Sequence, residues 1–268
     1  MRISYSKYTA FVKNPERFRL YYMLGLTPEG DDTPTNMNLG RRRGKCFHAI
    51  YEGTPEADLI KEYGRDLFNR ANGMRAVVPD LGPMDWVERE FEVPILDGKH
   101  SINGRMDHRL KSTGGLGDFK TTKGTRTKKE VIEYFGELET SSQHHFYLKA
   151  AASFGEPTNQ FTYHVVFDRK DKDHKPTYVP LVLPPEYNGP ASIERTMSEV
   201  YAACEAIEAM TAYGIEKPWM HSNTWPCCGD RAFCGYAGIC GRTIPKGCVP
   251  EGFTSRYKEQ IQSEEGAL

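Results

Sequence analysis

The sequence predicts an α/β protein in which a central mixed β-sheet is flanked by helices. Three observations lead to this class. The middle of the chain alternates apolar and polar residues as β-strands do, helical patterns lie on both sides of it, and two more strand-like segments follow. A helical N-terminal segment and a cysteine-rich C-terminal segment complete the expected architecture.

Helix signals dominate the first seventy residues. Ser6 is predicted to cap a helix that runs through Val12, and Asn14 to cap a second helix with proline at its first position. Gly25 is expected to end this second helix, and a loop rich in Pro, Asp, Thr and Asn is expected through Asn38. Further helices are predicted at about 39–52 and 55–72.

Strand signals begin where Phe91, Val93 and Ile95 alternate with polar residues. Two further strands are predicted at 100–110 and 115–121, and the Ser-Thr-Gly-Gly turn between them predicts a hairpin. Beyond the hairpin, the patterns predict helices at about 128–138, 141–154 and 191–213, with strands at about 160–168 and 177–183.

Composition limits the classes of protein that the chain can represent. At 268 residues and a net charge of −1, the chain suits one large domain, and any contact with nucleic acid must come from local basic clusters. No run approaches the roughly 18 apolar residues of a membrane span, and the N-terminus lacks a secretory signal, so a cytosolic location without membrane contact is expected. Seven cysteines, five of them within 227–248, favour metal binding over disulfides in a reducing compartment.

The predicted hairpin carries the clearest chemical signal. Asp118 and Lys120 share one face of a strand because side chains alternate, and the pairing strand can bring Asp107 beside them. Buried like charges repel unless a cation lies between them, and hard oxygen ligands suit Mg²⁺ or Mn²⁺. Such a metal activates water and neutralises a phosphate, while Lys120 can orient that water or stabilise the transition state. The alternative is an ordinary exposed hairpin with a salt bridge.

Two helices add candidate residues to this motif. Helical spacing aligns His48 with Arg41, Lys45 and Glu52, so the imidazole can supply a third metal ligand. Gln143 and Tyr147 lie four residues apart on one helix face, where neutral hydrogen bonds can hold a phosphate or a base. Taken singly, each feature is more typical of a structural histidine or of a surface amide beside a buried tyrosine.

Together these residues resemble the RecB-like branch of the PD-(D/E)xK nucleases, which includes CRISPR-associated adaptation exonucleases and phage recombination exonucleases. The similarity covers about residues 4–240 and implies a restriction-endonuclease-like core. Met106 stands where the name of the motif places proline. The matching patterns are Gly-x-x-x-His at 44–48, Gly-x-x-Asp at 104–107, Asp-x-Lys-Thr at 118–121 and Gln-x-x-x-Tyr at 143–147.

The resemblance implies a role for each motif residue. Lys120 would be the catalytic lysine, and Gln143 and Tyr147 would complete the catalytic set with the two aspartates. The implied ligands of Mg²⁺ or Mn²⁺ are His48, Asp107, Asp118 and the backbone carbonyl of Phe119.

DNA is the implied substrate, either single-stranded or as duplex ends, held through its phosphates with little base specificity. The resemblance also implies an exonuclease of recombination, repair or CRISPR-type processing, with a partner protein, in the cytoplasm of a bacterium or a phage-infected cell. The alternatives are a DNA-binding or assembly module with a vestigial nuclease fold and a metal-cluster scaffold. The expected DNA contacts are Arg41, Arg42, Arg43, Lys45 and Lys123.

The late cysteines resemble the C-terminal motif of iron–sulfur members of this branch, in which three late cysteines and one early cysteine hold a [4Fe–4S] cluster. Asn14 stands at the early position, so the fourth ligand stays open. Structural Zn²⁺ is the alternative metal, and reduced thiols in a small core are the alternative to any metal. The expected ligands are Cys228, Cys234, Cys240 and Cys248, with Cys227 as a substitute.

The expected organisation is one nuclease domain over residues 1–256, with a polar tail at 257–268. The nuclease core is expected at about 39–185. The helical and cysteine-cluster part, a metal-cluster subdomain, is expected at about 1–30 plus 186–256.

Overall fold

The computed structural model describes residues 1–28, 33–123, 128–168, 176–219, 236 and 239–255; within these, only the backbone is described at 33–41, 123, 128–130 and 168. The chain divides into two compact units. The first comprises Met1–Asp32, Pro94–Ser101 and Met197–Leu268, and the second comprises Thr33–Val93 and Ile102–Thr196.

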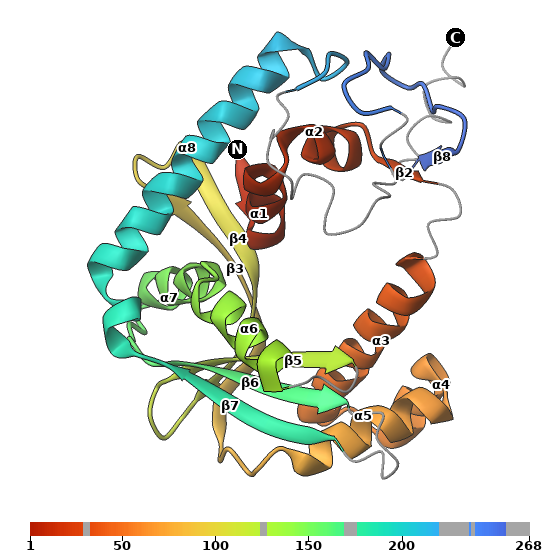
Figure 1. Cartoon of the computed structure of the whole chain (residues 1–268). Coiled ribbons are helices and arrows are strands. Elements are labelled where there is room, and N and C mark those ends of the chain that lie inside the picture. Colours follow the sequence, from red (N-terminus) through yellow and green to blue (C-terminus); the bar gives the residue numbers. More distant parts are fainter. Residues whose placement is uncertain (29–32, 124–127, 169–175, 220–235, 237–238, 256–268) are drawn as a thin grey trace. The chain divides into compact units, whose positions relative to one another are not determined.

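A mixed β-sheet organises the second unit, as the strand pattern predicted (Figure 1). The expected hairpin pairs β4 with β5 antiparallel, β5 pairs with β6 in parallel, and β6 pairs with β7 antiparallel. On the other side of β4 lies β3, and β1 pairs with the start of β4, which belongs with β1 to the first unit. The strands are β1 Arg2–Ser4, β3 Met84–Ile95, β4 His100–Leu110, β5 Leu116–Lys123, β6 Phe161–Asp168 and β7 Thr177–Leu183.

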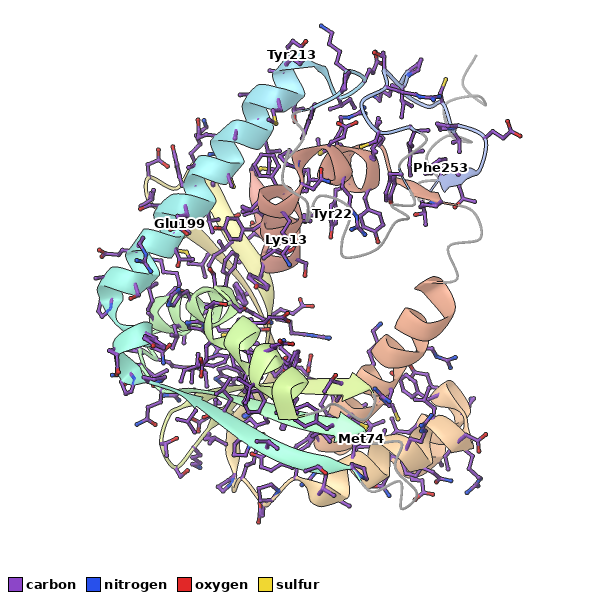
Figure 2. The ribbon with its side chains drawn as sticks, in the orientation of Figure 1. Lys13, Tyr22, Met74, Glu199, Tyr213 and Phe253 are labelled. Atoms are coloured by element: carbon purple, nitrogen blue, oxygen red, sulfur yellow. The ribbon has the colours of Figure 1, made fainter. Side chains whose placement is uncertain are left out.

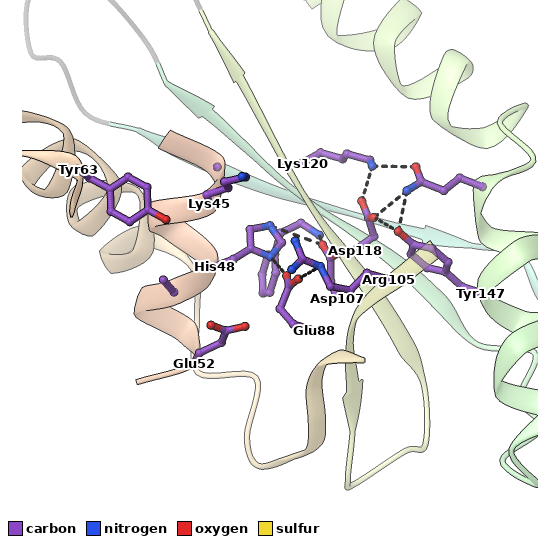
Figure 3. Close-up of a pocket in the computed structure, with 14 residues that line it drawn as sticks. Lys45, His48, Glu52, Tyr63, Glu88, Arg105, Asp107, Asp118, Lys120 and Tyr147 are labelled. Carbon is purple, nitrogen blue, oxygen red and sulfur yellow. Dashed lines mark hydrogen bonds and ion pairs between the residues drawn. The ribbon is translucent and has the colours of Figure 1, made fainter. Parts of the chain in front are cut away.

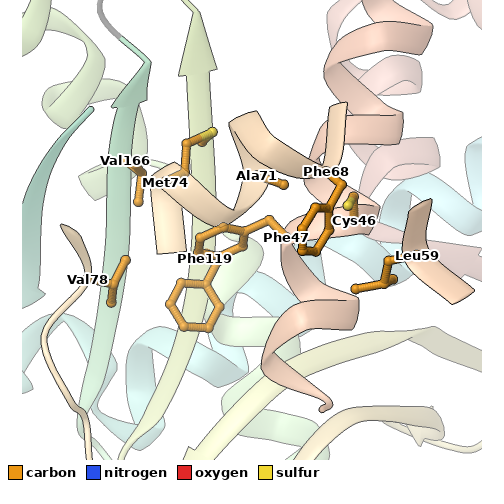
Figure 4. Close-up of a cluster of buried hydrophobic side chains, with 9 residues drawn as sticks. All are labelled: Cys46, Phe47, Leu59, Phe68, Ala71, Met74, Val78, Phe119 and Val166. Carbon is orange, nitrogen blue, oxygen red and sulfur yellow. The ribbon is translucent and has the colours of Figure 1, made fainter. Parts of the chain in front are cut away.

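Helices cover both faces of this sheet. On one face, Phe119 of β5 packs against Phe47 of α3 in a buried cluster that also holds Met74 of α5 (Figure 4). On the other face, Phe161 of β6 contacts Tyr147 of α7, and Phe167 in the same strand contacts α6. The helices are α3 Thr33–Tyr51, α4 Glu56–Tyr63, α5 Arg65–Val77, α6 Lys128–Glu139, α7 Gln143–Ser153, the 3₁₀ helix η2 Pro185–Asn188 and α8 Pro190–Gly214.

Helix boundaries differ from the predictions at several places, including the second helix, which is α2 Pro15–Phe18 followed by a π-helix at Arg19–Met23, and α5, which extends to Val77. α3 begins at Thr33 rather than at about 39, so the predicted loop ends earlier than Asn38. The helix predicted at 55–72 is two helices, because Gly64 adopts a left-handed conformation with φ of 86° between them. Ser4, rather than Ser6, caps the first helix through its side-chain oxygen. Among the described helices, none has the length and apolar character that crossing a membrane requires.

The first unit joins the N-terminal helices to the described part of the tail. Asn14 caps α2 as predicted, since its Oδ1 accepts from the Arg17 backbone N–H at 2.9 Å. A short antiparallel pair, β2 with β8, links Leu26 to Ser255, and Phe253 lies in a small apolar cluster beside it (Figure 2). The elements are α1 Tyr5–Lys13, α2 Pro15–Phe18, the π-helix η1 Arg19–Met23, β2 Leu26–Pro28 and β8 Phe253–Ser255.

A buried ion pair completes this unit, and we call it the Glu16–Arg19 clamp. Both side chains are fully buried, and Arg19 donates to the two carboxylate oxygens of Glu16 at 2.6 and 2.8 Å. The carboxylate also accepts from the backbone N–H groups of Trp219 and Gly241. Arg19 in turn donates to backbone carbonyls near residues 215 and 242. The clamp therefore ties the N-terminal helices to the segment that follows α8.

Candidate active site

The hairpin brings the two predicted aspartates together. His108 of β4 is opposite Gly117 of β5, and continuing this antiparallel register places Asp107 opposite Asp118. Gly117 is required at this position because a Cβ there would lie 2.1 Å from the Nε2 of His108. Asp107 Oδ2 accepts a hydrogen bond from the backbone N–H of Phe119 at 2.7 Å, which fixes one carboxylate against the neighbouring strand.

Burial makes this pair of carboxylates electrostatically costly. The side chains of Asp107 and Asp118 are 12% and 3% exposed. Burial, followed by repulsion from Asp118, raises the pKa of Asp107 to about 7. The site therefore holds two acidic groups that repel each other and favour a nearby positive charge.

Lys120 supplies one positive charge, as the motif predicted. Its Nζ lies 2.7 Å from Asp118 Oδ2 and donates to Gln143 Oε1 at 2.8 Å (Figure 3). Burial opposes a charged lysine, but the Asp118 carboxylate outweighs it, and the pKa of Lys120 is raised. The ammonium is therefore held protonated in a fixed position.

Gln143 and Tyr147 complete this side of the site from the N-terminal part of α7. The Gln143 amide donates from Nε2 to Asp118 Oδ1 at 3.1 Å and to the Tyr147 hydroxyl at 2.8 Å. Tyr147 donates to the same Asp118 oxygen at 3.2 Å. Burial and the Asp118 carboxylate raise the pKa of Tyr147 well above its usual value, so it stays a neutral donor. Tyr147 is buried, as the alternative interpretation has it, but its hydroxyl and the Gln143 amide both contact Asp118, so the pair faces the predicted site.

His48 reaches the carboxylates from α3. Its Nε2 lies 3.7 Å from Asp107 Oδ2, and its Nδ1 forms a hydrogen bond with Glu88 Oε1. Burial lowers the pKa of His48, but the bond to Glu88 and the charge of Asp107 outweigh burial and raise it. Glu88 also pairs with Nε of Arg105.

Glu88 and Arg105 are site residues that the sequence motifs did not identify. Counted back from Phe91 and Val93, strand alternation places residue 88 on the face of the exposed Glu90. Glu88 instead has a left-handed backbone with φ of 53°, and its side chain is only 8% exposed. The weak signal available in the sequence was a glutamate in the strand that precedes the Gly-x-x-Asp motif.

All of these groups line one cavity of about 560 Å³ (Figure 3). It lies entirely within the second unit, and α3, β3, β4, β5 and α7 all contribute to it. Lys45 and His48 of α3 and Glu52 just after it share the lining, while the side chain of Arg41, the fourth residue of the predicted stripe, lies outside the described part of the chain. Tyr63 lines it as well, and burial and its bond to Glu62 raise the pKa of Tyr63 to about 12.

The residues present fit a divalent cation. One potential ligand atom from each of His48, Glu88 and Asp107 lies within 4.8 Å of the other two, and Asp107 is buried. Carboxylate oxygens with one imidazole form a donor set suited to Mg²⁺ or Mn²⁺. Asp118, a predicted ligand, is outside this group of three and pairs with Lys120, while Phe119 lines the cavity.

The predicted DNA-contacting residues fall into different environments. Lys45 is exposed at the cavity, whereas Arg42 donates to the backbone carbonyl of Glu62. Arg43 is 7% exposed, which leaves little of its side chain for a phosphate. The side chains of Arg41 and Lys123 lie outside the described part of the chain.

Of the five cysteines predicted as cluster ligands, only two lie within the described residues. Cys227, Cys228 and Cys234 lie outside the described residues, while Cys240 is half-buried and Cys248 exposed. Asn14, at the early position, uses its side chain to cap α2. Within the described segments, no group of three potential metal ligands includes a cysteine.

Comparisons with known proteins agree with this geometry. The family model described as the PD-(D/E)XK nuclease superfamily matches residues 60–241, more than half of the chain. The match contains Asp107, Asp118, Lys120, Gln143 and Tyr147, and begins after His48. No curated protein matches the chain.

Solved structures share the fold. A candidate exonuclease from Eubacterium rectale has a TM-score of 0.51 and 13% identity, covering 77% of this chain and 82% of its own. At this identity the likeness shows the fold alone. Two other structures are more distant. The structure of SSO0001 has a TM-score of 0.38 and 14% identity, and the match covers 91% of this chain and 88% of SSO0001. Rai1 from Scheffersomyces stipitis, solved with 3′-NADP⁺ and calcium, has a TM-score of 0.28 and 12% identity, and the match covers 79% of this chain and 60% of Rai1.

Proposed function

The chain belongs to the PD-(D/E)XK nuclease superfamily, and from that membership we propose that it is a divalent-metal-dependent deoxyribonuclease that degrades DNA from its ends. One observation carries the proposal. Asp107, Asp118 and Lys120 converge in a cavity that also contains His48. The hairpin brings the aspartates and the lysine together, whereas His48 comes from a helix about sixty residues earlier in the sequence. A fold that had lost its chemistry would have no reason to keep two buried carboxylates side by side.

The proposed cation site uses groups from three elements. His48, Asp107 and Asp118, with the carbonyl of Phe119, would hold Mg²⁺ or Mn²⁺. When bound, the cation supplies Lewis-acid stabilisation of the phosphate and activates the attacking water. Asp107 is already oriented for this role by the backbone N–H of Phe119.

Lys120 then acts on the substrate itself. Its ammonium faces the cavity beside Asp118, where it can orient the water or stabilise negative charge that grows on the phosphate. Gln143 keeps the lysine and the aspartate together, because its amide oxygen accepts from one and its amide nitrogen donates to the other. Lys45, exposed at the rim, supplies a phosphate contact without base specificity.

The resemblance to RecB-like exonucleases supports the finer parts of the proposal. These are action on single strands or duplex ends, a place in recombination, repair or CRISPR-type processing together with a partner protein, and work in the cytoplasm of a bacterium or a phage-infected cell. The cysteines between residues 227 and 248 add a [4Fe–4S] cluster to the proposal, with structural Zn²⁺ as the alternative. Metal analysis of protein purified without oxygen or chelator decides this part: about four iron per chain supports the cluster and about one zinc the alternative.

The main experiment compares DNA substrates that differ in their ends. End-labelled duplex, single-stranded DNA and closed circular plasmid are each incubated with the full chain in Mg²⁺, Mn²⁺ or EDTA. We expect cation-dependent degradation of the molecules with ends and an intact circle. A circle cut as fast as linear DNA would overturn the exonuclease part, and DNA binding without any cleavage would favour the vestigial-fold alternative.

Two alanine variants tie the activity to the site. Asp118→Ala removes a carboxylate from the cavity and should abolish cleavage. Asp58→Ala is the matched control, since it removes an exposed carboxylate from α4, outside the cavity, and should leave cleavage unchanged. Full activity in Asp118→Ala would contradict the assignment.

A further inference from the structure

Glu88 occupies a strained position that its surroundings maintain. A glutamate with φ of 53° lies in the left-handed region, which non-glycine residues rarely adopt. This turn breaks the alternation of β3 and directs the carboxylate into the cavity (Figure 3). The side chain is 8% exposed, so the unfavourable backbone conformation coincides with a buried charge. Strain of this kind persists where the surrounding contacts determine the conformation.

The two oxygens of Glu88 have different partners. Oε1 forms a hydrogen bond with His48 Nδ1, and Oε2 pairs with Arg105 Nε. Arg105 is half-exposed at the cavity and belongs to the strand that carries Asp107. The guanidinium therefore balances the buried carboxylate and restricts its rotation, which leaves one oxygen aimed at the histidine.

The two nitrogens of His48 consequently face different groups. Nδ1 faces Glu88, while Nε2 faces Asp107, 3.7 Å from its Oδ2. A neutral imidazole carries one N–H, and a carboxylate that accepts at Nδ1 keeps the proton there and leaves the Nε2 lone pair available. A carboxylate behind a histidine is a common way to orient a metal-binding imidazole.

We propose that Glu88, held by Arg105, is a positioning residue that fixes His48 as its Nδ1–H tautomer, with Nε2 turned toward the cation site. The cation site itself rests on the proposed function, but the tautomer does not. Glu88 acts through His48 and is not assigned a contact with substrate.

The test uses Glu88→Gly in the full chain. Glycine suits the left-handed backbone of residue 88, so this variant removes the carboxylate without adding strain. Glu88→Asn is a second variant, because asparagine also tolerates this conformation and is too short to keep the bond to His48. Glu90→Gln is the matched control, since it removes an exposed carboxylate two residues along the same strand.

Nitrogen-15 NMR of the imidazole rings, in alkaline buffer with chelator, reads the tautomer directly. The His48 signal is assigned by its loss in His48→Asn. We expect Nδ1–H in the wild type and in Glu90→Gln, and a shift toward Nε2–H in both Glu88 variants, because Asp107 then attracts the proton. An unchanged Nδ1–H signal in the Glu88 variants would overturn the proposal.

Calorimetric titration with Mn²⁺ provides a second readout. Loss of a group that orients a ligand weakens metal affinity by roughly 10–100-fold, so we expect this in Glu88→Gly and no change in Glu90→Gln. Weaker binding with an unchanged tautomer would make Glu88 a ligand and overturn the positioning role. A wild type that binds no Mn²⁺ would contradict the proposed function, while the NMR result would still decide the role of Glu88.

Discussion

Glu16 and Asp107 are both buried carboxylates, one in each unit, but their charges are balanced in different ways. Glu16 receives two hydrogen bonds from Arg19 and two from backbone N–H groups. Burial favours its neutral form, but these bonds outweigh burial and lower the pKa of Glu16. Asp107 receives one backbone hydrogen bond and lies beside Asp118, and its pKa rises to about 7.

The difference distinguishes a charge that is balanced within the fold, that of Glu16, from the charge of Asp107, which we propose to be a cation ligand. The partners of Glu16 all come from within the fold, so its negative charge stabilises the first unit as it stands. Asp107 has too few partners for its charge, and the cavity in front of it leaves room for a positive group from outside. A buried acid whose pKa is shifted upward in a cavity marks a functional site better than burial alone.

The largest expected effect, and the strongest test of this difference between the two carboxylates, comes from neutralising Asp107. Asp107→Asn should abolish DNA cleavage, because one of the proposed cation ligands loses its charge. The same change should raise the free energy of unfolding of the metal-free protein, since repulsion with Asp118 disappears. Cleavage assays and urea denaturation in chelator measure the two effects. Retained cleavage, or a less stable variant, would contradict this view of Asp107.

Neutralising Glu16 should have the opposite consequence for stability. Glu16→Gln leaves the buried guanidinium of Arg19 without a counter-charge, and breaking a buried pair in this way costs about 3–5 kcal/mol. Urea denaturation checks this, with Glu56→Gln on the surface of α4 as the control. A loss as small as that of the control would mean that the clamp contributes little to the fold.

A smaller effect is expected from replacing Lys120, a half-buried lysine of the second unit, and it should differ from the effect of replacing the exposed Lys45. Lys120→Ala should lower turnover about a hundredfold, the scale for removing one group that stabilises a transition state, with little change in DNA affinity. Lys45→Ala should do the reverse, because an exposed phosphate contact affects binding. Single-turnover cleavage and DNA titrations separate the two. Weaker binding with normal turnover in Lys120→Ala would reduce Lys120 to a phosphate contact.

The two carboxylates should also differ in the pH dependence of stability, measured without metal. Folding raises the pKa of Asp107 from 3.8 to about 7, so between these values the folded state binds more protons than the unfolded state. Stability should therefore fall as pH rises through this range, by at most about 1.4 kcal/mol per pH unit. Asp107→Asn should lose this slope.

Glu16 should affect the stability of the fold at acidic pH instead. Its lowered pKa contributes stability that is present above pH 4.5 and lost as pH falls through the folded-state value. Glu16→Gln should thus flatten only the acid limb of the stability curve. Denaturation midpoints across pH give both limbs, and variants with the same profile as the wild type would show that neither carboxylate dominates.

Sequence patterns predicted much of the site because its central motif is local. Asp118 and Lys120 share a strand face through alternation, and a turn of four residues sets the hairpin that brings Asp107 to them. Gln143 and Tyr147 lie one helical turn apart, so they too meet without long-range information. The α/β class and the mixed sheet were predicted on the same local grounds and are confirmed.

The remaining features depend on packing that the sequence does not display. Glu88 was missed because its left-handed backbone breaks the alternation from which its orientation would be inferred. The early start of α3 was missed because a segment rich in Pro, Thr and Asn favours loops by propensity. The clamp was missed since Glu16 and Arg19 look like ordinary helix-surface charges until residues some 200 positions later cover them.

The orientation of the Gln143 amide has a consequence for the chemical ageing of the protein. Its oxygen accepts from Lys120, and its nitrogen donates to Asp118 and Tyr147. Hydrolysis of this amide would replace the donating nitrogen with a carboxylate oxygen and set a third negative charge against Asp118. If the chain acts as proposed, deamidation at this one side chain should lower cleavage while leaving the fold almost unaltered.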